Sequence, residues 1–142
     1  MISLSHVHPM LVHFPIALVV FGFIADFASL IFKKEACLSK AGFYLLLGGT
    51  LSALLALLTG VFFTSEMSGS AGEVRETHEI FAWITLSILV LTSLMRIFIL
   101  VKNREHTNLK WFAFFLYALA AISVSLTGFY GGTLVYNYMM PL

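Results

Sequence analysis

The sequence predicts an all-α integral membrane protein, a four-helix bundle in up-down order built as two pseudo-symmetric helical hairpins. Of its 142 residues, 60% are hydrophobic and only 11% are charged, and the mean hydropathy is +0.97. Soluble domains carry about 25% charged residues, so this chain has too few to cover a surface in water. Four unbroken apolar stretches also reach the roughly 20 residues that a helix needs to cross a bilayer.

The same observations exclude other classes of protein. A membrane barrel would need short strands of alternating polarity, and these long apolar runs do not alternate. A net charge of +1 gives no basic excess for a nucleic-acid partner. We therefore expect one transmembrane domain, residues 1–142, in contact with the lipid bilayer. In chain order its helices are expected over about residues 10–32, 41–63, 79–101 and 111–130.

Two charged residues fall within the apolar part of the expected helices, away from their outer ends. Asp26 lies in the first and Arg96 near the end of the third, at similar depths in helices that run the same way. Because an unpaired charge in the apolar zone is costly, we expect an ion pair between them inside the bundle. Three alternatives stay open: Arg96 extends to the headgroups, Asp26 carries protons, or Arg96 meets a quinone headgroup.

The loop charges predict the orientation. Lysine and arginine follow the first and third helices, whereas glutamate dominates the segment 64–77, which we expect to be a loop. The basic residues are Lys33, Lys34, Lys40, Lys102, Arg104 and Lys110, and the acidic ones are Glu66, Glu73 and Glu76, with Arg75 beside them. Positive charge favours the cytoplasmic side. We therefore expect a multi-pass protein of the bacterial inner membrane, with both termini on the periplasmic, outer side.

Four of the five histidines fall at this outer end: His6, His8, His13 and His78. The chain also reads as a duplicated hairpin, in which LLALLTGVFF aligns without a gap to AISVSLTGFY. In the first half, His13 opens one helix and Thr59-Gly60 closes the next. In the second half, His78 opens one helix and Thr127-Gly128 closes the next. This repeat predicts that His13 and His78 face each other across the bundle.

Facing histidines in a four-helix bundle are the arrangement that six-coordinate haem b requires. We therefore expect a haem-b electron-transfer protein with His13 and His78 as axial ligands, and with His8 as the substitute ligand in the first helix. Gly60 and Gly128 would allow a flat cofactor to approach closely. Electron transfer is expected rather than substrate turnover, because no nucleophile–base pair or phosphate loop is present.

Two other functions remain open. Neutral imidazole also suits copper and zinc, so His6 and His8 with the outer glutamates could bind or transport a metal ion. Alternatively, the protein is a cofactor-free structural subunit whose histidines only form hydrogen bonds. Small residues along the second helix favour either an isologous homodimer or packing inside the monomer. They are Gly48, Gly49, Ser52, Ala53 and Ala56.

The chain carries the motifs HPMLVHFPIAL at 8–18 and TGFYGGTLVY at 127–136, with a Thr-Gly pair and a histidine between them, so the resemblance they support covers nearly the whole chain. They resemble the bacterial membrane family known as domain of unknown function 2231. The matching positions are His8, His13, His78, Gly131 and Gly132. The resemblance implies redox work with a c-type cytochrome or other redox protein. The chain departs after Tyr136, where Asn137 and Tyr138 replace the basic residue and histidine that family members often carry.

Overall fold

The computed structural model describes residues 7–103 and 108–138, and within these ranges every regular element is a helix. The elements are α1 Val7–Leu11, α2 His13–Ile31, α3 Ala36–Phe63, α4 Gly69–Val101 and α5 Asn108–Asn137. Counting α1 and α2 as one span, the described ranges contain 4 helical segments long and apolar enough to cross a membrane. The predicted all-α four-helix membrane architecture is confirmed.

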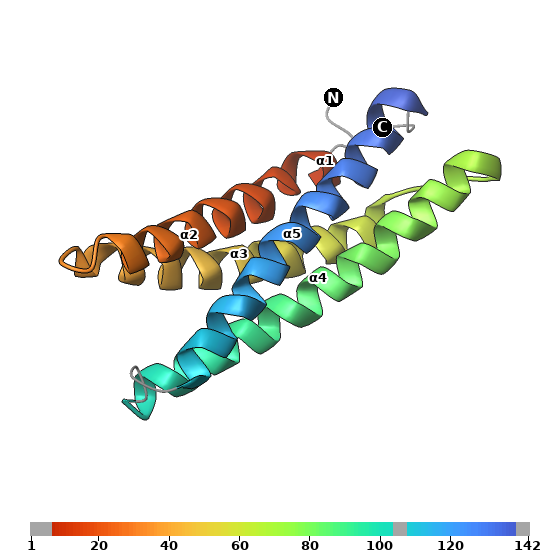
Figure 1. The fold of residues 1–142 in the computed structure, drawn as a ribbon. Coiled ribbons are helices and arrows are strands. Elements are labelled where there is room, and N and C mark those ends of the chain that lie inside the picture. The colour runs from red at the N-terminus through yellow and green to blue at the C-terminus, as the bar shows by residue number, and fades with distance from the viewer. Residues whose placement is uncertain (1–6, 104–107, 139–142) are drawn as a thin grey trace.

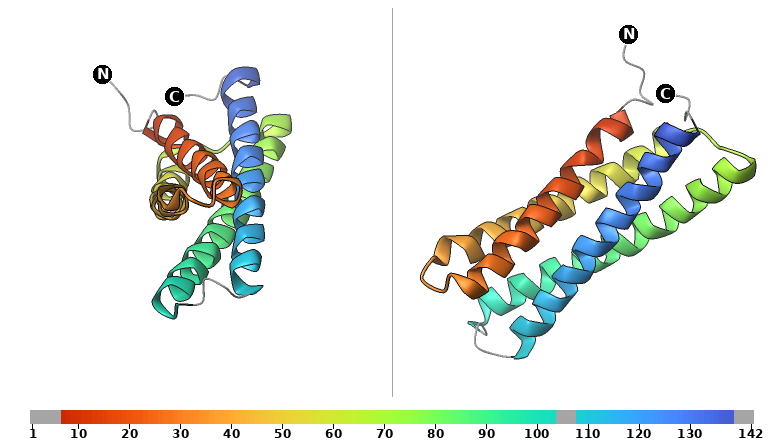
Figure 2. Two further views of the ribbon diagram at one scale, coloured as in Figure 1. Left: turned by 60° about the vertical axis from the view of Figure 1, so that its left-hand side comes forward. Right: turned by 45° about the horizontal axis from the view of Figure 1, so that its top comes forward.

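The helices form two hairpins. The first hairpin consists of α1, α2 and α3, the second of α4 and α5, and they meet where α2 packs on α5 and α3 on α4. The hairpins lie obliquely across one another (Figure 1), and both chain termini lie at one end of the bundle (Figure 2). We call this end, which also holds the α3–α4 connection, the terminal end. The opposite end, with the α2–α3 and α4–α5 connections, is the loop end.

The prediction that residues 64–77 form a loop is wrong for most of that segment. The helix α4 begins at Gly69, so only residues 64–68 connect it to α3. Gly69 has φ +65°, a left-handed conformation that glycine adopts without strain. The residues that follow, with Ala71, Glu73 and Arg75 among them, favour a helix. They therefore continue α4 outward beyond the apolar zone, so Glu73 and Glu76 lie on a helix, whereas Glu66 lies in the connection.

The first span is interrupted at Val12, which separates α1 from α2. Pro15 follows three residues later, and its ring removes a backbone N–H that would bond one turn earlier. The Val12 N–H still donates to the carbonyl of His8 at 3.1 Å, so the chain stays close to helical. As a result α1 packs against both α2 and α3, which brings His8 toward α3.

The core draws on all four spans, and small residues let the helices approach. Its buried cluster is Val19, Leu46, Ala53, Leu86, Leu89, Tyr117, Ala120 and Val124. At Gly42, an added Cβ would lie 2.9 Å from the Cβ of Asp26, so α2 and α3 touch nearly backbone to backbone. Large apolar side chains such as Phe21, Leu51 and Phe115 remain exposed on the outside, where lipid would contact them.

Polar contacts join the two hairpins in the interior. Arg96 donates from both terminal nitrogens to the two carboxylate oxygens of Asp26, at 2.9 and 3.0 Å. Both residues are buried. The Tyr117 hydroxyl donates to the carbonyl of Gly42 at 3.1 Å. The predicted Asp26–Arg96 ion pair is confirmed, and its bidentate geometry uses the planar guanidinium fully.

The small residues of α3 are used largely within the monomer. Gly49, Ala53 and Ala56 are buried, and an added Cβ at Gly49 would lie 2.6 Å from a methyl carbon of Val19. Of the two arrangements left open by the sequence, packing inside the monomer is therefore observed for these three residues. The homodimer stays a prediction.

Candidate functional site

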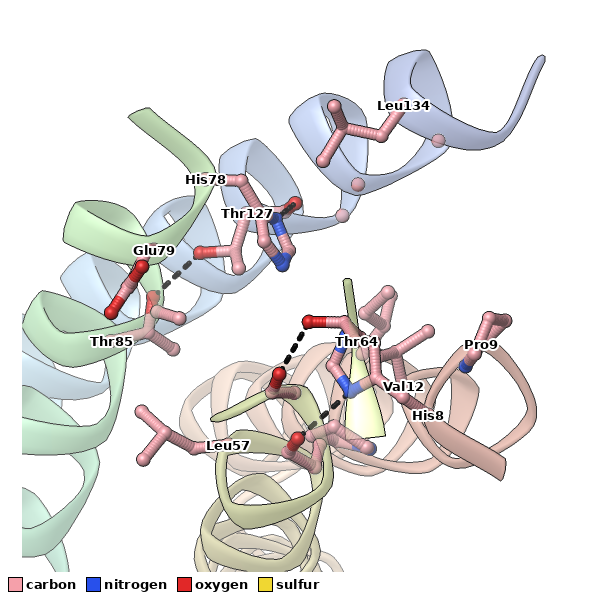
Figure 3. A pocket seen from close by; sticks show the side chains of 18 of the residues that line it. His8, Pro9, Val12, Leu57, Thr64, His78, Glu79, Thr85, Thr127 and Leu134 are labelled. Atoms are coloured by element: carbon pink, nitrogen blue, oxygen red, sulfur yellow. Dashed lines mark hydrogen bonds between the residues drawn. The ribbon is translucent and has the colours of Figure 1, made fainter. Parts of the chain in front are cut away.

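A cavity of about 400 Å³ opens between the two hairpins at the terminal end (Figure 3). Its size falls within the range of about 300–1,000 Å³ that small-molecule and cofactor sites occupy. Every helix contributes to its walls, which consist mainly of apolar and small side chains. The polar residues that line it are His8, His13, Thr64, Glu66, Arg75, His78, Glu79, Thr85, Thr127 and Tyr136.

His8 enters this cavity from the first hairpin. Its Nδ1 lies 2.9 Å from the carbonyl oxygen of Ala56 and 3.2 Å from the Thr59 hydroxyl oxygen. Because a carbonyl only accepts hydrogen bonds, Nδ1 carries the proton and donates a hydrogen bond to the Ala56 carbonyl on α3. The ring therefore has a fixed orientation against the end of α3.

His78 occupies the equivalent place in the second hairpin. Its Nδ1 donates to the carbonyl oxygen of Thr127 on α5, at 2.9 Å. Each hairpin thus presents one imidazole, tied through Nδ1 to a carbonyl of the neighbouring helix. Figure 3 shows both rings directed into the same space.

The two rings lie close together, with their centroids 6.2 Å apart and their planes at 77°. Since Nδ1 holds the proton in each neutral ring, Nε2 carries a free lone pair. Within the described residues, 7–103 and 108–138, neither Nε2 forms a hydrogen bond. A metal-binding histidine usually donates its other ring N–H to an outer partner such as a backbone carbonyl. The Nδ1–H bonds of His8 and His78 match this pattern and leave each Nε2 available to bind a metal.

A glycine packs against each imidazole. An added Cβ at Gly60 would lie 2.9 Å from Cε1 of His8, and one at Gly131 would lie 3.0 Å from Cε1 of His78. Any larger residue would therefore press on the ring. Gly128, which the sequence predicted for this role, instead faces Ile16, where an added Cβ would lie 2.8 Å from a methyl carbon.

The structure pairs His78 with His8, not with His13. His13 stands at the start of α2 with an exposed side chain, although it borders the cavity. The prediction that His13 and His78 face each other is therefore wrong, and His8, the predicted substitute for His13, faces His78 instead. His6, proposed as a metal ligand with His8, lies outside the described residues.

The cause of this error is the register of the internal repeat. The Thr-Gly strings align Gly60 with Gly128, but the hydrogen bonds align Gly60 with Gly131. In each half the histidine and its carbonyl acceptor are 48 or 49 residues apart, for His8 to Ala56 and His78 to Thr127. These spacings differ by a single residue, and a glycine follows each acceptor four residues later; together they were the signal that could have identified the pair.

Hydroxyl groups continue the polar lining below His78. The Thr85 hydroxyl lies 2.7 Å from that of Ser123 and 3.0 Å from that of Thr127, whose carbonyl accepts from His78. Thr85 and Ser123 are both buried. This network fixes α4 against α5 and, through Thr127, supports the position of the His78 ring.

These contacts lie within the part of the chain that a known family model matches. The family described as "Predicted membrane protein (DUF2231)" matches residues 5–141 of the chain. The chain belongs to the DUF2231 family. The match confirms the resemblance found in the sequence, and its extent includes His8, His78, Gly60 and Gly131. Comparisons with curated proteins and with solved structures gave no match.

Among the described residues of this DUF2231 chain, the imidazoles that come together at the cavity are those of His8 and His78. Among the described residues, no three histidine, cysteine, aspartate or glutamate side chains come together as a metal site. A structural zinc ion normally takes four protein ligands, so His8 and His78 alone would leave half of its positions unfilled. A cofactor that brings its own equatorial ligands needs only these two.

Proposed function

We propose that this protein binds haem b between His8 and His78 and transfers electrons at the outer side of the membrane. The 6.2 Å separation of the two rings supports this proposal most directly. With metal–nitrogen bonds of about 2.0–2.1 Å on opposite sides of one ion, two imidazole ring centres lie about 6 Å apart. A haem held by His8 and His78 would supply one-electron chemistry at its iron.

The surroundings of the pair support a flat, mostly apolar occupant. Each hairpin packs mainly within itself, and the cavity lies between the two hairpins. A flat molecule could therefore enter between them without separating either pair of helices. Gly60 and Gly131 keep the rings pulled back against the helices. The apolar walls around them would exclude water from the iron, which affects its reduction potential.

The orientation supports a partner on the outer side. Lys33, Lys34 and Lys40 lie at the loop end, whereas Glu73 and Glu76 lie in the first turns of α4 at the terminal end. By the positive-inside rule the terminal end faces the periplasm. A c-type cytochrome or another periplasmic redox protein would then approach the haem from that side.

Purified protein loaded with haem tests this function, and His13 provides the matched control. The wild type is expected to give a Soret band at one haem per chain. His8→Ala and His78→Ala should each lower haem affinity at least about tenfold, since losing even the outer hydrogen-bond partner of a metal ligand costs about 10–100-fold. His13→Ala, an exposed residue beside the same cavity, should bind haem like the wild type.

The titration is read as the dissociation constant from absorbance, with folding of each variant checked by circular dichroism. A folded wild type that shows no Soret band with excess haem would overturn the proposal. Loss of haem binding in His13→Ala but not in His8→Ala would show that His13, and not His8, is the ligand. Elemental analysis showing bound copper without haem would favour the metal-binding alternative.

A further inference from the structure

Arg75 stands at the outer mouth of the cavity, above His78. It lies three residues before His78 on α4, so both project from the same side of the helix. The rise of a helix places Arg75 about 4.5 Å nearer the terminal end. Among the described residues that line the cavity, it is the one lysine or arginine. The other charged side chains that line the cavity are the carboxylates of Glu66 and Glu79, so Arg75 supplies positive charge at its mouth.

The present partner of Arg75 is a weakly held carboxylate. The guanidinium donates one hydrogen bond, from Nη1 to Oε2 of Glu66 at 3.1 Å. The Glu66 side chain is 91% exposed and that of Arg75 is 21% exposed. An ion pair so open to solvent contributes little to stability. The guanidinium has five N–H donors and suits a bidentate carboxylate, so a second carboxylate could displace or join Glu66.

We infer that Arg75 binds the propionate carboxylates of the haem, in competition with Glu66. This inference rests on the proposed function. With the iron between His8 and His78, the polar edge of the haem would point to the terminal end, where Arg75 lies one helical turn outward. Binding of a propionate would exchange the Glu66 carboxylate on Arg75 for another carboxylate, so the guanidinium would keep an ion pair.

Haem and haem dimethyl ester, whose propionates are masked, test this role by titration into the purified full chain in neutral detergent. The wild type should bind haem about tenfold more tightly than the ester, since a charge-assisted hydrogen bond is about twice as strong as a neutral one. Arg75→Gln should bind both forms with nearly equal affinity. Its Soret band at saturation should match the wild type, because the iron ligands are unchanged.

Glu66→Gln provides a second test that does not depend on folding of the arginine variant. Removing the competing carboxylate should raise haem affinity severalfold and leave ester affinity unchanged. The matched control is Glu73→Gln, because Glu73 is also exposed on the outer part of the chain and does not line the cavity. It should leave both affinities as in the wild type.

The outcomes separate this inference from the proposed function. Failure of the wild type to bind either form would overturn the haem function and this inference with it. Equal wild-type affinity for haem and its ester would overturn the role of Arg75 alone. So would an Arg75→Gln variant that keeps the wild-type preference for haem.

Discussion

Replacing Arg96 with alanine is expected to lower the free energy of unfolding by about 3–5 kcal/mol, the usual cost of removing one partner of a buried ion pair. Asp26 would remain buried without its two hydrogen bonds from the guanidinium. The pair also joins α2 to α4, so its loss weakens the contact between hairpins. Unfolding of the purified protein in mixed micelles with increasing denaturing detergent measures the change.

The double variant Asp26→Leu/Arg96→Met is the informative control. It removes both charges and refills the space with apolar atoms, and such replacements of buried pairs are often neutral or stabilising. Lys40→Ala, which changes an exposed charge near the loop end, should lie within about 0.5 kcal/mol of the wild type. An Arg96→Ala variant as stable as Lys40→Ala would show that the pair carries no stability.

Gly42→Leu is expected to disrupt the first hairpin. Its Cβ would lie 2.9 Å from the Cβ of Asp26 and 3.0 Å from the carbonyl oxygen of Gly22. Backbone atoms cannot rotate away as a side chain does, so α2 and α3 would have to separate. Overpacking alone costs about 1–3 kcal/mol, and displacement of Asp26 from Arg96 adds to this loss.

Gly48→Leu is the matched control on the same helix. An added Cβ at Gly48 would meet only a methyl carbon of Leu18, at 3.6 Å, which is ordinary contact. The helix propensity of leucine is also more favourable than that of glycine, by about 0.8 kcal/mol. The same detergent titration should find Gly48→Leu near the wild type and Gly42→Leu clearly less stable. Equal stability of the two variants would contradict the packing described between α2 and α3.

The fold was predictable because a bilayer imposes simple requirements on sequence. The length of the apolar stretches predicted the four spans. The cost of burying an unpaired charge predicted the ion pair between Asp26 and Arg96. The helix ends were less predictable, since α4 extends to Gly69 through polar residues that hydropathy assigns to a loop. Helix propensity, rather than hydropathy, determines where a helix ends once it has left the apolar zone.

The site was predictable in kind but not in register. Two facing histidines followed from the repeat, whereas the choice between His8 and His13 depended on which side of α1 and α2 faces the bundle. That choice follows from contacts with Ala56 and Gly60 on α3, which lie far away in sequence. The place of Arg75 at the cavity was not predictable for a related reason. It depends on the helical turn that aligns Arg75 with His78 in a segment expected to be a loop.

The central claim is that His8 and His78 together bind one haem iron. Electron paramagnetic resonance of the oxidised, haem-loaded wild type tests it most directly, with near-infrared magnetic circular dichroism on the same sample to identify the axial ligands. Two imidazoles predict a six-coordinate low-spin iron with a bis-histidine charge-transfer band, and His78→Ala should convert it to a high-spin, five-coordinate form. A high-spin signal in the wild type, or a low-spin bis-histidine signal that survives in His78→Ala, would contradict this assignment.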